Sequence, residues 1–193
     1  MISPSPQTYP AADSDRELLH HRCIDVRGWR RRDGLFEVEA TLTDTKALPK
    51  PWTRSDGVLH QMSICVTFDD DFVVHDIQAR SGVVPYPVCA EAAAGLATLK
   101  GLSMASGWVR TVRERLGGVK GCTHLVEMLA PVATTAFQTT SELRMSRPDR
   151  LDSNGRPVKI DTCLAYSRHG DLVRQRWPEH YQSLPRIDSA VPP

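Results

Sequence analysis

CIDVRGWRRRDGLFEVEATLTDTK, residues 23–46, holds two stretches in which apolar and polar residues alternate, as they do along β-strands. Between the two stretches lies Asp33-Gly34, and this dipeptide readily adopts the positive φ angles of a tight hairpin turn. The segment therefore predicts an antiparallel hairpin made of residues 22–30 and 35–44.

The next segment continues the sheet. HQMSICVTFDDDFVVHDIQAR, residues 60–80, predicts two further strands at about 60–68 and 72–80, joined by the acidic turn Asp69-Asp70-Asp71. Four antiparallel strands in succession are expected.

After Pro87 the apolar residues recur with the spacing of helices instead of strands. Three helices are expected, within residues 88–102, 106–116 and 123–143, the last with a kink at Pro131. A C-terminal hairpin is expected from IDTCLAY (160–166) and DLVRQRW (171–177). Strands followed by helices favour an α+β fold, in which three helices pack on one face of an antiparallel sheet of about four strands and a hairpin follows.

The composition fits one globular domain. The chain has 193 residues, of which 40% are hydrophobic, and we expect a single domain at 20–182 between flexible segments at 1–19 and 183–193. With 24 basic and 23 acidic residues, the chain has no overall field that would draw it to nucleic acid or to an anionic membrane. No apolar run reaches the length of a membrane span, and the N-terminus lacks the features of a signal peptide.

These properties predict a soluble, cytoplasmic protein with neither nucleic acid nor membrane as a partner. Its five cysteines make an odd and irregularly spaced set, which favours reduced thiols over a disulfide framework. The edge strands of an antiparallel sheet also make a homodimer a reasonable expectation.

Two cysteines occur at the starts of expected helices. Cys89 follows a proline-bearing loop, and Cys122 follows a glycine-rich one. The positive end of a helix dipole stabilises a thiolate, which is the form that binds a metal or attacks a carbon. The alternative is that both are small buried residues where the chain turns. His60, at the entrance of a strand, adds an imidazole of the kind that zinc binds, although a histidine at such a place is often only solvated.

Other candidates lie on the two expected helices after residue 105. Arg110 and Arg113 are three apart and share a helix face, so that together with Trp108 they could frame an acidic or aromatic ligand. A solvated helix surface is the alternative interpretation. His124 and Glu127 lie close to Cys122 on the third helix, where they are candidates for a catalytic acid or base.

Several segments carry a family resemblance. RRDGLFEVEATLTDTK, YPVC, GGVKGCTHL and ATTAFQT resemble a bacterial family known as domain of unknown function 2889, over about residues 22–177. This resemblance implies little about activity.

A more distant resemblance covers about residues 58–140. HQMSICVTFDDDFVVHDIQARSGVVPYPVCAEAAAG and LGGVKGCTHL look like segments of the NifU-like iron–sulfur scaffold proteins. The resemblance places Cys89 and Cys122 at the second and third scaffold cysteines and His60 at the metal-binding aspartate. The first scaffold cysteine is replaced by Val58, and the histidine before the third is replaced by Gly121, so a four-ligand cluster site is incomplete.

Three ligands with an open fourth position remain, as in catalytic zinc sites. The leading hypothesis is therefore a metal-dependent enzyme of small-molecule metabolism, a hydrolase or a carbon–carbon lyase. Its zinc, or iron, would be bound by His60, Cys89 and Cys122. The alternatives are an iron–sulfur or metal carrier and a metal-free binding module.

Overall fold

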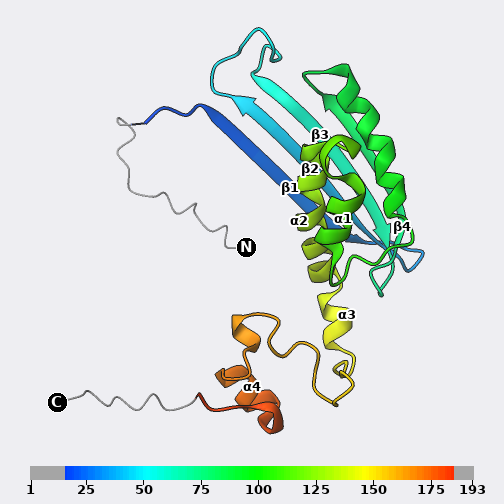
Figure 1. Ribbon diagram of the computed structural model, residues 1–193, viewed down its shortest axis with the longest axis vertical. Coiled ribbons are helices and arrows are strands. Elements are labelled where there is room, and N and C mark those ends of the chain that lie inside the picture. Colours follow the sequence, from blue (N-terminus) through cyan, green and yellow to red (C-terminus); the bar gives the residue numbers. More distant parts are fainter. Residues whose placement is uncertain (1–15, 185–193) are drawn as a thin grey trace, which may run out of the picture. The chain divides into compact units, whose positions relative to one another are not determined.

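The structure is a computed structural model, and it describes residues 16–184 (Figure 1). The chain divides into two compact units at the boundary between residues 141 and 142. The single domain expected at 20–182 has residues in both units, and the segments expected to be flexible, 1–19 and 183–193, lie mostly outside the described residues.

The first unit contains the predicted four-stranded antiparallel sheet, with the strands side by side in chain order. The strands are β1 (His20–Arg30), β2 (Phe36–Lys46), β3 (Val58–Phe68) and β4 (Val74–Val83). At the first turn Gly34 has a φ of 90°, which is the conformation that the Asp-Gly step was expected to supply. The α+β fold with four antiparallel strands is confirmed.

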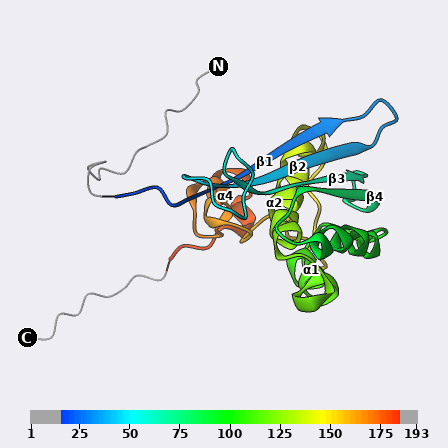
Figure 2. The ribbon, with the colours of Figure 1, turned by 90° about the horizontal axis from the view of Figure 1, so that it is seen from above.

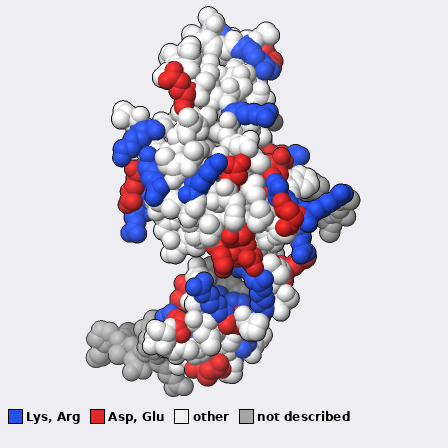
Figure 3. Space-filling view, turned by 90° about the vertical axis from the view of Figure 1, so that its right-hand side faces the viewer, with Lys and Arg blue, Asp and Glu red and all other residues white. Residues whose placement is uncertain are grey.

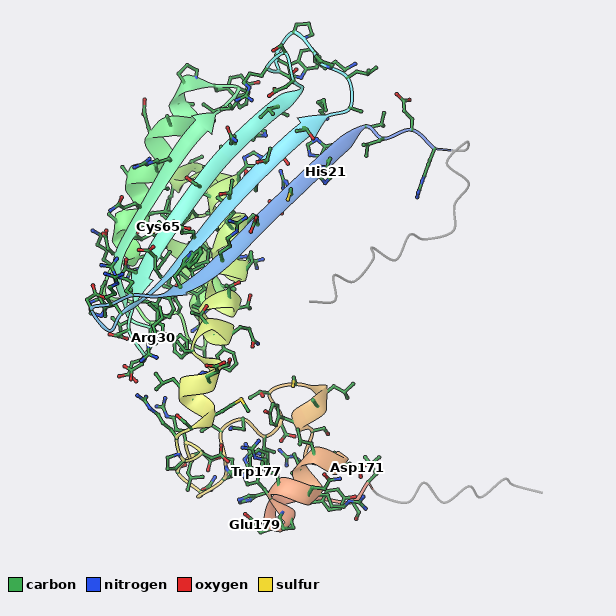
Figure 4. All side chains as sticks on the ribbon, turned by 180° about the vertical axis from the view of Figure 1, so that it is seen from behind. His21, Arg30, Cys65, Asp171, Trp177 and Glu179 are labelled. Atoms are coloured by element: carbon green, nitrogen blue, oxygen red, sulfur yellow. The ribbon has the colours of Figure 1, made fainter. Side chains whose placement is uncertain are left out.

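Helices cover one face of this sheet, as Figure 2 shows. The alternation in β2 produces this arrangement, because Val38, Ala40 and Leu42 are fully buried while Glu39 and Thr41 between them are exposed. Within the described residues of the first unit the other face carries no helix, and Figure 4 shows Cys65 of β3 from that side.

The helices after β4 differ in part from their predictions. They are η2 (Pro87–Leu99), α1 (Trp108–Leu116), η3 (Gly118–Lys120), α2 (Thr123–Thr139) and α3 (Ser141–Met145). The first is a 3₁₀ helix, in which residues three apart align, and its two buried residues, Leu96 and Leu99, have this spacing. The expected third helix runs through Pro131 but ends at Thr139, so that residues 123–143 form two helices.

The second unit lacks the expected C-terminal hairpin. Residues 160–166 and 171–177 contain no strand and instead contribute to η4 (Leu164–Tyr166), α4 (Asp171–Arg176) and, beyond them, η5 (Pro178–His180). Val173 and Trp177 are four residues apart and both pack against Ile160, so the segment follows a helical and not a strand period. The side chains of this unit, with Asp171 and Trp177 labelled, are drawn in Figure 4.

Two features of the described chain concern possible partners. Within residues 16–184, no helix is both long enough and apolar enough to cross a membrane. On the face drawn in Figure 3, basic and acidic side chains are interspersed over the described residues, in keeping with their nearly equal numbers in the sequence.

Candidate metal centre

The register of the sheet aligns three polar residues from neighbouring strands. Arg22 of β1 pairs with Asp44 of β2, and Asp44 pairs with His60 of β3. Directly paired residues project from the same face of a sheet, and here that face is the one covered by helices. The β2–β3 register shifts just after this point, between Asp44 and Thr45, so Asp44 is the last residue of β2 in the regular register.

Asp44 is at the centre of this row, and its side chain is only 1% exposed. Nε of Arg22 donates to Oδ1 of Asp44 at 2.7 Å, and Nη2 of Arg22 donates to Oδ2 at 2.7 Å. Nδ1 of His60 lies 3.0 Å from Oδ2. A buried carboxylate is thus held in one orientation by a bidentate guanidinium and an imidazole.

The third member of the site comes from α2. Nε2 of His124 lies 3.7 Å from Oδ2 of Asp44, and the rings of His124 and His60 have centroids 4.0 Å apart. Asp44, His60 and His124 each offer one ligand atom, and these three atoms all lie within 4.8 Å of one another. Among the described residues, this is the one group of this kind that could hold a metal ion.

The path of α2 along the sheet explains why His124 arrives there. Near its other end, Thr139 lies against Gly28 of β1, where a Cβ atom on the glycine would be 1.7 Å from Oγ1 of Thr139. The fifteen residue steps from His124 to Thr139 span about 22 Å of helix, and the six steps from Arg22 to Gly28 span about 20 Å of strand. The two contacts therefore match a helix that runs along β1.

The charges of the site favour an ionised aspartate and a neutral histidine. Burial alone would raise the pKa of Asp44, but the hydrogen bonds and charge of Arg22, with His60 and His20, outweigh burial and lower the pKa to about 2. Burial and the charges of His60 and Arg22 lower the pKa of His124. A neutral imidazole and a carboxylate are the protonation states that bind metals.

Two more polar side chains border the group. Nη1 of Arg22 donates to Oε2 of Glu127 at 2.5 Å, and Nε2 of His20 lies 3.2 Å from Oδ1 of Asp44. The side chains of both Glu127 and His20 are more exposed than those of Asp44, His60 and His124. The site therefore opens towards solvent on the side of Arg22, His20 and Glu127.

Of the three ligands expected from the sequence, the structure places only His60 in this group. Sγ of Cys122 lies 3.7 Å from Nδ1 of His124 and 4.0 Å from Sδ of Met62, so Cys122 is a neighbour of the group and not a member of it. Cys89 is a half-buried residue of η2 and is not in the group either.

The predicted substrate residues surround pockets along α1. Trp108, Arg113 and Glu127 line one pocket of about 430 Å³, and Trp108 and Arg110 line another of about 570 Å³. Trp108 is itself buried and donates from Nε1 to the carbonyl of Leu129. Arg110 lies 3.9 Å from Glu114 in an exposed pair.

The first pocket lies on a different side of α2 from the metal group. Its α2 lining includes Thr123, Val126 and Ala130, which form a stripe with helical spacing, whereas His124 faces the sheet. Glu127 borders both features. The catalytic and substrate residues expected as one site are thus divided by α2, with Glu127 between the two parts.

A comparison with protein-family models identifies the family of the chain. A family model described as "Protein of unknown function (DUF2889)" matches residues 20–138, which include the whole sheet and all but the last residue of α2. The chain belongs to the DUF2889 family. The comparisons with curated proteins and with solved structures gave no match.

The DUF2889 region contains every residue of the candidate metal centre, from His20 to Glu127. The family predicted from the sequence is confirmed over residues 20–138, whereas the resemblance was expected to extend over about 22–177, and its description assigns no activity. The resemblance to NifU-like scaffold proteins has no support from these comparisons. Sequence reasoning missed Asp44, although an aspartate at the end of an otherwise apolar strand face was a visible signal.

Proposed function

We propose that the DUF2889 region is a metal-dependent enzyme of small-molecule metabolism, with zinc bound by Asp44, His60 and His124. The observation that carries this proposal is the convergence of three ligand atoms within 4.8 Å, on a largely buried carboxylate and two histidines from β2, β3 and α2. Two histidines and one carboxylate also suit iron(II), so metal analysis decides between the two ions.

The spacing of the donors suits a metal ion. Zinc binds nitrogen and oxygen at about 2.0–2.2 Å, so donors around it lie roughly 3–4 Å apart. The two histidine nitrogens lie 3.0 and 3.7 Å from Oδ2 of Asp44. A carboxylate has two oxygens with several lone pairs, so Oδ1 retains Nε of Arg22 and Nε2 of His20, while Oδ2 accepts from Nη2 of Arg22 and has a further lone pair for the metal.

Three protein ligands leave a position for water or substrate, which is the arrangement of catalytic zinc. The metal would supply a Lewis acid that polarises a substrate oxygen or lowers the pKa of a bound water. Either use suits a hydrolase or a carbon–carbon lyase. With His124 as a ligand, Glu127 is the predicted acid or base that remains, and Arg22 holds it beside Asp44.

Cys122 has a supporting role in this proposal. Metal-bound histidines usually bond through their second ring nitrogen to a partner that fixes the ring. Sγ of Cys122 lies 3.7 Å from Nδ1 of His124, on the nitrogen opposite the one that faces Asp44. An iron–sulfur carrier is less favoured, because the group found among the described residues contains no cysteine.

The test is elemental analysis of the full chain purified without added metal. We expect near-stoichiometric zinc or iron in the parent and its loss in Asp44→Ala, His60→Ala and His124→Ala. His75→Ala is the matched control, because His75 of β4 also pairs with an aspartate, Asp69, but this pair is more exposed and lies outside the group. Circular dichroism confirms that each variant is folded.

Cobalt substitution then separates this ligand set from the one expected from the sequence. A cobalt site with only nitrogen and oxygen ligands lacks the intense near-ultraviolet charge-transfer band of a cobalt–thiolate bond. Metal-free parent protein, or metal retained in Asp44→Ala, would contradict the proposal. A thiolate band that disappears in Cys122→Ala would favour the predicted set of His60, Cys89 and Cys122 instead.

A further inference from the structure

One side of the candidate metal centre is open to solvent. Side-chain exposure rises from 1% at Asp44 to 32% at Arg22 and 51% at Glu127. The candidate metal position is therefore open to solvent on the side of the Arg22–Glu127 pair.

The charge of the loaded site favours an anion. Arg22 carries one positive charge, whereas Asp44 and Glu127 each carry one negative charge, so the three side chains together have a charge of about −1. A divalent metal bound between neutral His60 and His124 changes this to about +1. A single negative charge on the substrate would neutralise the site, and a neutral substrate would leave the positive charge uncompensated.

One hydrogen bond donated by Arg22 can be transferred from Glu127 to a ligand. Its Nε and Nη2 are fixed on buried Asp44, but Nη1 donates to Glu127, which is more than half exposed. An exposed ion pair of this kind contributes little stability, roughly 0–1 kcal/mol, so another carboxylate can displace Glu127 at small cost. A carboxylate that also reaches the metal gains a second attachment that Glu127 lacks.

We propose that the centre binds a small monocarboxylate, whose carboxylate group takes the place of Glu127 on Nη1 of Arg22 beside the metal. This inference rests on the proposed metal site. Displacement would free the carboxylate of Glu127 from its ion pair next to the bound molecule, where it can accept a proton. Arg22 then binds the substrate, and Glu127 accepts from Nη1 of Arg22 only until the substrate carboxylate displaces it.

The experiment uses the cobalt-loaded full chain and follows its visible absorption during titration with acetate and benzoate, with acetamide as the neutral probe. We expect saturable spectral changes with both carboxylates and none with acetamide. The two substitutions of the pair should act in opposite directions. Glu127→Gln should strengthen carboxylate binding, since it removes the competing charge, and Arg22→Gln should weaken it by about tenfold, as for a lost charge-assisted hydrogen bond.

Glu114→Gln is the matched control, because Glu114 is an exposed helical glutamate that faces only Arg110 at 3.9 Å. Its carboxylate affinity should equal that of the parent. Unchanged affinity in Arg22→Gln, or weaker binding in Glu127→Gln, would overturn the inference. If Arg22→Gln fails to hold cobalt, Glu127→Gln carries the test, since Glu127 is not a ligand.

The two proposals fail in different ways. A parent protein that shows no cobalt bands at all overturns the metal site and, with it, the inference. Cobalt bands that do not respond to either carboxylate overturn the inference alone.

Discussion

The contact between Gly28 of β1 and Thr139 of α2 can be tested by adding a single methyl group. In Gly28→Ala the new Cβ would lie 1.7 Å from Oγ1, 2.9 Å from Cβ and 3.0 Å from Cγ2 of Thr139. Thr139 would have to move, and its hydrogen bond to the carbonyl of Thr135, now 2.8 Å, would be lost. The contact matters for function because it fixes the course of α2, which carries His124 to Asp44.

The expected cost follows from three contributions. Overpacking costs about 1–3 kcal/mol, and a lost hydrogen bond costs about 1 kcal/mol. Alanine is favoured over glycine in a strand by about 0.5–1 kcal/mol, which offsets part of the loss. Gly28→Ala should therefore lower the free energy of unfolding by about 2 kcal/mol, measured by urea denaturation with circular dichroism.

Gly82→Ala is the control, because Gly82 also lies in a strand of this sheet and its added Cβ would come no closer than 3.4 Å to the carbonyl of Gln61. Its stability should be unchanged or slightly higher. Thr139→Ala removes two of the three clashing atoms, so the double variant with Gly28→Ala should recover about 1 kcal/mol. Parent-like stability of Gly28→Ala, or an equal loss with and without Thr139, would refute this packing.

Three further predictions concern other parts of the chain. The pKa of Asp44 is about 2 in the folded protein against 3.8 ordinarily. Its ionised carboxylate therefore stabilises the folded protein by about 2 kcal/mol above pH 4, and this stabilisation is lost as the pH falls to 2. In metal-free protein, the difference in unfolding free energy between the parent and Asp44→Asn should shrink by that amount over this range; a constant difference would contradict it. Burial raises the pKa of Cys65 to about 11, so at pH 8 iodoacetamide should modify it at least about tenfold more slowly than exposed Cys23, as peptide mass spectrometry would show. Trp177→Ala should cost the second unit about 3–5 kcal/mol, making residues 142–184 sensitive to limited proteolysis, and a resistant variant would show that this small core is not needed.

The strands were predictable because their pattern is local. The alternation along Phe36–Lys46 and Val58–Phe68 distinguishes buried from exposed positions without knowledge of the partners. The segment DLVRQRW was misread for the same reason, since Leu172 and Val173 beside polar residues fit a short strand as well as a helix. Only the packing of Val173 and Trp177 on Ile160 decides for the helix.

The candidate site was harder to predict because its members meet through register and helix placement. His60 was expected as a ligand, but its partner Asp44 is identified only by the pairing of β2 with β3. His124 was expected as an acid or base, and its approach to Asp44 depends on where α2 lies on the sheet. The sequence interpretation selected Cys89 and Cys122 because thiolates bind metals. The structure instead brings together the oxygen and nitrogen donors of Asp44, His60 and His124.

The boundaries of the family and of the structure support the placement of the function in one unit. The DUF2889 match ends at residue 138, three residues before the first compact unit ends at Ser141. All three candidate ligands, as well as Arg22 and Glu127, lie within that shared range. The second unit has a separate small core around Trp177. A metal centre in the first unit therefore depends on the sheet and α2, and it should remain intact in variants that disturb only residues 142–184.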